Sequence, residues 1–129
     1  MRGSLASRIG RPLDSIGRRQ AARLRLAMPG KLVTIYETRR CIVLDLSQTG
    51  ARIAVDRPLV RGEAGILQCA GIDCFADVVR SEDGGNALAF EEWLLPEQVL
   101  AIRDYAEHFD EHQRREFRRT ARDWISGGG

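Results

Sequence analysis

Long apolar runs are missing from this sequence, and their absence narrows where the protein can act. No stretch approaches the roughly 18 apolar residues that a membrane-spanning helix needs. The N-terminus also lacks the apolar segment of a secretory signal peptide. We therefore expect a cytoplasmic protein that is not inserted into a membrane.

Histidine and cysteine are too few and too scattered to indicate a metal site or a catalytic centre. The only histidines, His108 and His112, lie four residues apart in an expected helix, with no third ligand near them in the sequence. Ser47 lacks both a histidine base and the Gly-x-Ser-x-Gly context of a hydrolase nucleophile. The cysteine spacings fit no zinc or disulfide pattern, so we expect three reduced core residues, Cys41, Cys69 and Cys74. The sequence therefore predicts no enzyme activity, no catalytic residue, no metal and no cofactor.

The 129 residues suffice for one domain, and a hydrophobic content of 43% suffices for one core. A net charge of +2 argues against a strongly basic nucleic-acid binder. The charge is unevenly distributed, because residues 1–25 hold seven arginines and a single acid, Asp14. Residues 1–17 mix Gly, Ser, Arg and Pro without a periodic apolar pattern, which predicts a flexible arm. Because this arm is basic, we expect it to bind an anion.

From Leu24 onward, short apolar or alternating runs are separated by turn residues. Asp83-Gly84-Gly85-Asn86 is the strongest hairpin signal, and Pro29-Gly30 is expected to interrupt or bulge the first run. Strict alternation in the third run places Arg52 outside the core, opposite to Ala51, Ile53 and Val55. The pattern predicts six strands in a sandwich or a small barrel, at residues 24–36, 39–46, 51–56, 65–70, 72–80 and 86–91.

After Pro96 the apolar spacing becomes helical, with intervals of three and four between Leu95, Val99, Ile102, Ala106 and Phe109. This predicts one amphipathic helix that closes the fold. Residues 110–116 are almost wholly polar, so the helix either kinks or leaves the body there. In the Arg-rich distal helix, Phe117 and Trp124 either form a surface for a partner protein or simply pack as two aromatics on a solvated helix.

Two short motifs carry the functional information. Arg19-Gln20-Ala21-Ala22-Arg23 precedes the first expected strand, and Asp45-Leu46-Ser47-Gln48-Thr49-Gly50 lies in the turn after the second. Together they resemble the PilZ family, whose pattern is Arg-x-x-x-Arg at the entry to a six-stranded barrel and Asp/Asn-x-Ser-x-x-Gly between strands two and three. The resemblance covers residues 18–109. It implies an all-β, six-stranded antiparallel barrel with a C-terminal helix, between the arm at 1–17 and a distal helix and frayed tail at 110–129.

By this resemblance the chain binds cyclic di-GMP, a bacterial second messenger, and passes the signal to a protein partner. Arg19 and Arg23 are then expected to clasp guanine and phosphate, because a guanidinium group fits both guanine O6 and N7 and a phosphate. Asp45 and Ser47 are expected to read the guanine edge that carries the N1–H and N2–H donors. The implied ligand-binding residues are Arg18, Arg19, Arg23, Asp45, Ser47, Gly50 and Arg52.

Three of these residues have particular roles in the hypothesis. Arg18 stands before the first motif, where an arginine favours a stacked pair of ligands. Gly50 is expected to allow a positive φ or a close approach of the ligand to the main chain. Arg52, facing outward two residues later, is a further candidate contact. The hypothesis also includes ordering of the arm when ligand binds.

Other interpretations remain open at this point. Asp45 and Ser47 could instead satisfy local backbone groups in a turn. The protein could be an adaptor of the same fold that binds only proteins. A small barrel that binds single-stranded nucleic acid is less favoured, because the strands offer few aromatic residues for stacking, namely Tyr36, Phe75 and Phe90.

Overall fold

The computed structural model describes residues 24–82 and 85–125. The predicted arm at 1–17 and the predicted ligand residues Arg18, Arg19 and Arg23 lie outside this part of the chain. The described strands are β1 (Leu24–Val33), β2 (Thr38–Leu46), β3 (Gly50–Ala54), β4 (Ala64–Cys69), β5 (Ile72–Glu82) and β6 (Gly85–Phe90). They are followed by helices α3 (Pro96–Glu107) and α4 (Glu111–Ile125). Neither of these helices is long and apolar enough to cross a membrane.

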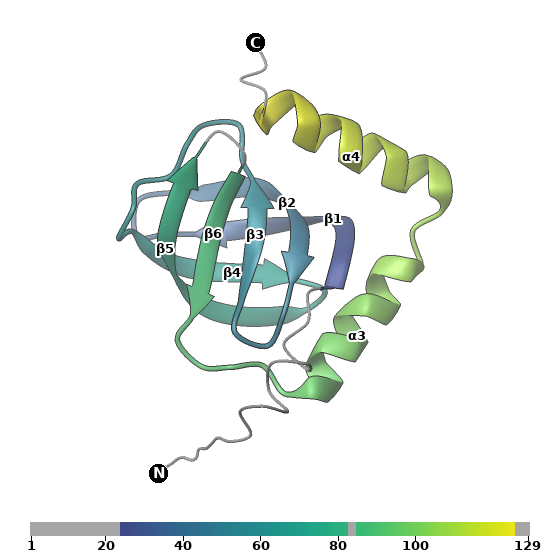
Figure 1. Cartoon of the computed structure of the whole chain (residues 1–129), viewed down its shortest axis with the longest axis horizontal. Coiled ribbons are helices and arrows are strands. Elements are labelled where there is room, and N and C mark those ends of the chain that lie inside the picture. Colours follow the sequence, from purple (N-terminus) through teal and green to yellow (C-terminus); the bar gives the residue numbers. More distant parts are fainter. Residues whose placement is uncertain (1–23, 83–84, 126–129) are drawn as a thin grey trace.

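The six strands form a closed antiparallel barrel in the order β1-β2-β3-β6-β5-β4 (Figure 1). Pairing of β1 with β4 closes it. Between β4 and β5, Ala70 and Gly71 adopt φ values of 52° and 77°, the positive values that a tight two-residue hairpin turn requires. The predicted all-β fold with six strands and a C-terminal helix is confirmed, as a barrel and not a sandwich.

The barrel interior holds the main hydrophobic core. As the alternation predicted, Ala51, Ile53 and Val55 are buried there. The three cysteines are also buried and unpaired. Burial raises the pKa of Cys41 and of Cys69 to about 12 and that of Cys74 to about 11, so all three are thiols at neutral pH.

Helix α3 covers the barrel and completes this core. Ile102 and Ala106 are buried, and Val99 and Phe109 pack beside them. Leu95 was predicted on the same apolar face but is 55% exposed. It precedes the helix as its N-terminal cap, where its backbone N–H donates to Gln98 Oε1 at 2.8 Å, so its side chain is directed away from the helix's buried stripe.

Helix α4 is a separate helix that packs against the outside of the barrel, on the same side as α3 (Figure 1). Asp110 starts it, because its carboxylate accepts the Gln113 N–H at 2.8 Å while Gln113 Oε1 accepts the Asp110 N–H at 3.0 Å. Phe117 and Trp124 are partly buried against the barrel. Of the two interpretations of these aromatics, the packed one is therefore the one that the structure shows.

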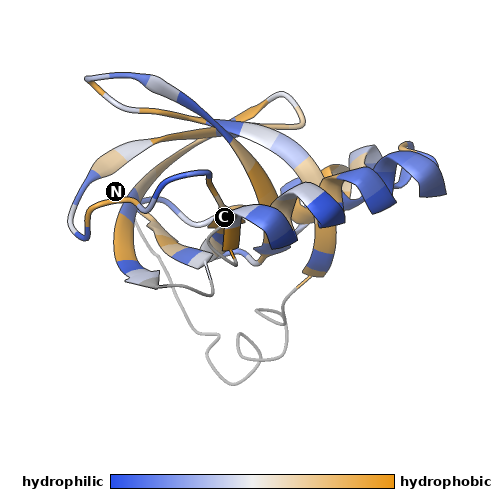
Figure 2. Cartoon of the chain, turned by 90° about the horizontal axis from the view of Figure 1, so that it is seen from above, coloured by the Kyte–Doolittle hydropathy of each residue, from blue (hydrophilic) through white to orange (hydrophobic). Residues whose placement is uncertain are grey.

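The barrel surface under α4 is built from small and branched apolar side chains. Ala27, Ile42 and Ala54 point outward from β1, β2 and β3 and are buried, together with Ala121 of α4. Most residues along the two helices are hydrophilic (Figure 2). A second, smaller apolar layer therefore ties α4 to these three strands.

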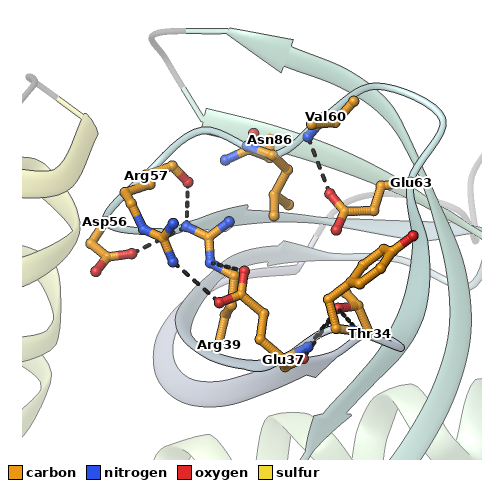
Figure 3. Close-up of polar contacts among 10 residues, drawn as sticks. Thr34, Glu37, Arg39, Asp56, Arg57, Val60, Glu63 and Asn86 are labelled. Carbon is orange, nitrogen blue, oxygen red and sulfur yellow. Dashed lines mark hydrogen bonds and ion pairs between the residues drawn. The ribbon is translucent and has the colours of Figure 1, made fainter.

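Arg39 fixes the start of β2 to the segment after β3 (Figure 3). Its side chain is only 6% exposed, and its guanidinium group donates to Asp56 Oδ1 at 3.1 Å and to the carbonyl of Arg57. Glu37 lies beside it and also accepts from Arg57 at 3.3 Å. The Asp56 carboxylate and the Arg57 carbonyl satisfy Nη2 of this buried arginine, whereas its Nε is buried without a hydrogen-bond partner and lies 4.0 Å from Glu37 Oε2.

Candidate ligand-binding site

The candidate site begins with two β-bulges on neighbouring strands. The β1–β2 register shifts between Arg25 and Met28, and the β2–β3 register shifts between Val43 and Asp45. A bulge inserts an extra residue, so side-chain alternation restarts and consecutive side chains can share one face. The bulge in β1 was expected at Pro29-Gly30, but both residues pair regularly with β2 and the irregularity lies before them.

Two consecutive residues of each of these strands line one open pocket of about 390 Å³, and Leu26 of β1 also packs against the main core. Leu44 and Asp45 line it from β2, while the flanking Val43 and Leu46 are fully buried in the core. Among the residues that the structure describes, the lining consists of Arg25 and Leu26 of β1, Leu44 and Asp45 of β2, Arg52 of β3 and Arg118 of α4. Three guanidinium groups and one carboxylate therefore surround the pocket, which favours an anionic ligand.

Asp45 lies between two of these arginines. In the strand register it stands opposite Arg25 on one side and Arg52 on the other. Its Oδ2 lies 3.5 Å from Arg52 Nη1, with the Asp45 side chain 12% exposed and that of Arg52 40% exposed. The structure thus brings together two residues of the sequence prediction, and Arg52 faces outward as expected.

Ser47 lies outside the pocket lining and is used within its own turn. Its Oγ accepts the Thr49 N–H at 3.3 Å and lies 3.2 Å from Thr49 Oγ1 and 3.4 Å from the Gly50 carbonyl oxygen. The Ser47 N–H also donates to that carbonyl at 2.9 Å. For Ser47, the contacts observed are those of the local-turn interpretation.

Gly50 is required by a close approach of two strands. A Cβ at this position would lie 2.2 Å from the Leu88 carbonyl oxygen on β6. The positive-φ residues of the described chain do not include Gly50, so the expectation of a positive φ is wrong. The close approach that the structure shows at Gly50 is that of the β6 backbone.

The β2–β3 turn is also attached to the segment that leads into α3. Leu94 N–H donates to the Gln48 carbonyl at 2.8 Å, and Gln48 Nε2 donates to the Leu94 carbonyl at 2.9 Å. Phe90 N–H donates to the Thr49 carbonyl at 2.9 Å. These bonds attach the turn that connects the Asp45 strand to the Arg52 strand to the end of β6 and the segment before α3.

Four of the pocket residues were not predicted from the sequence: Arg25, Leu26, Leu44 and Arg118. The β2 bulge at Leu44 leaves no clear mark in the sequence. None of the aromatic residues considered for base stacking lines the pocket: Tyr36 and Phe75 are exposed elsewhere, and Phe90 is buried.

The family model described as PilZ domain matches residues 17–107. The match includes both sequence motifs and ends before α4 begins. A search of curated proteins finds no match.

Proposed function

This chain belongs to the PilZ domain family, a family that binds cyclic di-GMP, and we propose that it is a cyclic di-GMP receptor that signals to a protein partner. The supporting observation is the pocket on β1–β3, in which Asp45 of the second motif lies among three arginines. We place the protein's action in the cytoplasm; its buried, unpaired cysteines are compatible with a reducing compartment.

The proposed ligand chemistry uses both signs of charge in the pocket. The Asp45 carboxylate accepts from guanine N1–H and N2–H, for which two acceptor oxygens are the natural partner. Arg52 contributes a guanidinium group that suits a phosphate or guanine O6 and N7. Ser47 and Gly50 support this site by shaping and bracing the turn, and a direct ligand contact by Ser47 requires its hydroxyl to exchange a partner within the turn.

Arg19 and Arg23 are proposed to complete the site from the start of the barrel. Arg23 directly precedes Leu24, where β1 begins, and Leu24 pairs with Leu46, the neighbour of Asp45. We propose that these two arginines clasp guanine and phosphate and that Arg18 favours a stacked pair of ligands. About three or four charge-assisted hydrogen bonds, at roughly 1.5–3 kcal/mol each, suffice for micromolar binding.

Calorimetric titration with cyclic di-GMP tests this function. We expect saturable binding with a Kd in the micromolar range or below, and no comparable binding of GTP. Arg23→Ala should weaken binding by about tenfold, because one charge-assisted contact is lost while Arg19 is retained. The stoichiometry reports whether one ligand or a stacked pair binds.

The alternatives give different results in the same series. Absence of heat and of any thermal shift with cyclic di-GMP would reject the receptor and favour the protein adaptor. Binding to single-stranded polynucleotide that weakens steeply with salt, without a response to cyclic di-GMP, would favour the nucleic-acid barrel.

We also propose that ordering of the segment Arg18–Arg23 is the output of binding. Fixing a backbone residue costs about 1–2 kcal/mol, so ligand contacts to this segment must offset its ordering. The ordered segment then forms a surface that exists mainly in the bound state. Hydrogen exchange of amides in residues 1–23 should slow when cyclic di-GMP is added. Equal exchange with and without bound ligand would reject this output.

A further inference from the structure

The pocket and the α4 docking surface are continuous on the barrel. Leu44 lines the pocket and also packs against the apolar cluster that holds α4. Within α4, Phe117 packs against the barrel and the next residue, Arg118, lines the pocket. A helix that begins after the matched family residues therefore supplies one wall of the site.

The charge on this wall is only partly balanced within the helix. Glu111 lies 2.9 Å from Arg118 Nη2, and it also lies 3.7 Å from Arg114 Nε and 3.8 Å from Arg115 Nε. The single carboxylate of Glu111 therefore forms ion pairs with three guanidinium groups. Because Glu111 is 59% exposed, water weakens each of these ion pairs. Much of the positive charge of Arg118 therefore remains available to attract an anion in the pocket.

We propose that Arg118 binds a phosphate of the ligand, so that the ligand bridges the barrel and α4. This inference rests on the proposed function. A guanidinium group keeps its charge at every physiological pH and can make two parallel bonds to phosphate. The bridge links occupancy of the pocket to the docking of α4, since the phosphate contacts the helix as well as strands β1–β3.

Calorimetry with cyclic di-GMP on wild type, Arg118→Ala and Arg119→Ala tests the contact. Arg119 is the matched control: it lies on the same helix, is exposed, pairs with Glu116 at 3.2 Å and is not part of the pocket lining. We expect Arg118→Ala to raise the Kd about tenfold, the effect of losing one charge-assisted contact, and Arg119→Ala to leave it within about twofold. Arg118→Gln, which keeps most of the side-chain stem, should behave like Arg118→Ala.

A second readout separates ligand contact from a merely structural role. Cyclic di-GMP should slow hydrogen exchange in Glu111–Ile125 of the wild type, and this protection should be lost in Arg118→Ala even when the ligand is saturating. Urea unfolding checks that each variant is folded. Wild-type affinity in both Arg118 variants would overturn the inference while leaving the receptor function intact. Failure of the wild type to bind would overturn both.

Discussion

Replacing Gly50 by alanine should lower the free energy of unfolding by about 2–4 kcal/mol, through overpacking and the loss of strand hydrogen bonds. The added Cβ would lie 2.2 Å from the Leu88 carbonyl oxygen, so β3 and β6 must separate. Gly50 pairs with Ala89 at the end of this ladder, and the next pair is Ala51 with Leu88. A domain of this size is stable by only about 5–15 kcal/mol, so the variant should be marginal.

Urea unfolding followed by circular dichroism measures this loss, with Gly71→Ala as the control. Gly71 has a φ of 77°, and a Cβ added there would have no neighbouring atom within 4 Å, so alanine suffers backbone strain alone. We expect it to cost about 1 kcal/mol. Wild-type stability of Gly50→Ala combined with a loss of cyclic di-GMP binding would contradict this explanation and return Gly50 to a direct role against the ligand.

The fold was predictable because its signals are local. Apolar alternation with glycine-containing turns marked the six strands, and the intervals from Val99 to Phe109 marked the closing helix. The start of α4 was also readable in principle, because Asp110 and Gln113 have the spacing of a capping box. What the sequence does not state is where α4 docks. The docking position depends on small outward-facing residues such as Ala54. In the alternating pattern of its strand, Ala54 falls on the same face as polar residues, so the sequence gives no sign that it is buried.

The site was predictable only within the second motif and directly after it. Asp45 and Arg52 were identified, and the structure places them together. Leu44 lies within the register shift of β2, and single-residue shifts are set by the packing of neighbouring strands. Arg118 is 66 residues from Arg52 in the chain and joins it only through the docking of α4.

Replacing Asp45 by alanine should weaken cyclic di-GMP binding by about 100-fold or more. The carboxylate is expected to accept two guanine N–H groups, and each hydrogen bond to a charged group contributes roughly 1.5–3 kcal/mol. Stability should change little, because the Asp45–Arg52 pair is 3.5 Å long and Arg52 is substantially exposed, as in ion pairs that contribute about 0–1 kcal/mol. A large loss of affinity without a loss of stability is therefore the expected signature.

Calorimetry with cyclic di-GMP and cyclic di-AMP on wild type, Asp45→Ala and Asp73→Ala measures this effect. Asp73 is an exposed acid on β5 that is not part of the pocket lining, so its removal controls for the change in net charge. Adenine presents an acceptor at N1 in place of the guanine N–H, so the wild type should prefer cyclic di-GMP and Asp45→Ala should lose that preference. If Asp45→Ala bound cyclic di-GMP as tightly as Asp73→Ala does, residues other than Asp45 would have to recognise the guanine base. Asp45 would then serve only to orient Arg52, and the arginines alone would recognise the phosphates.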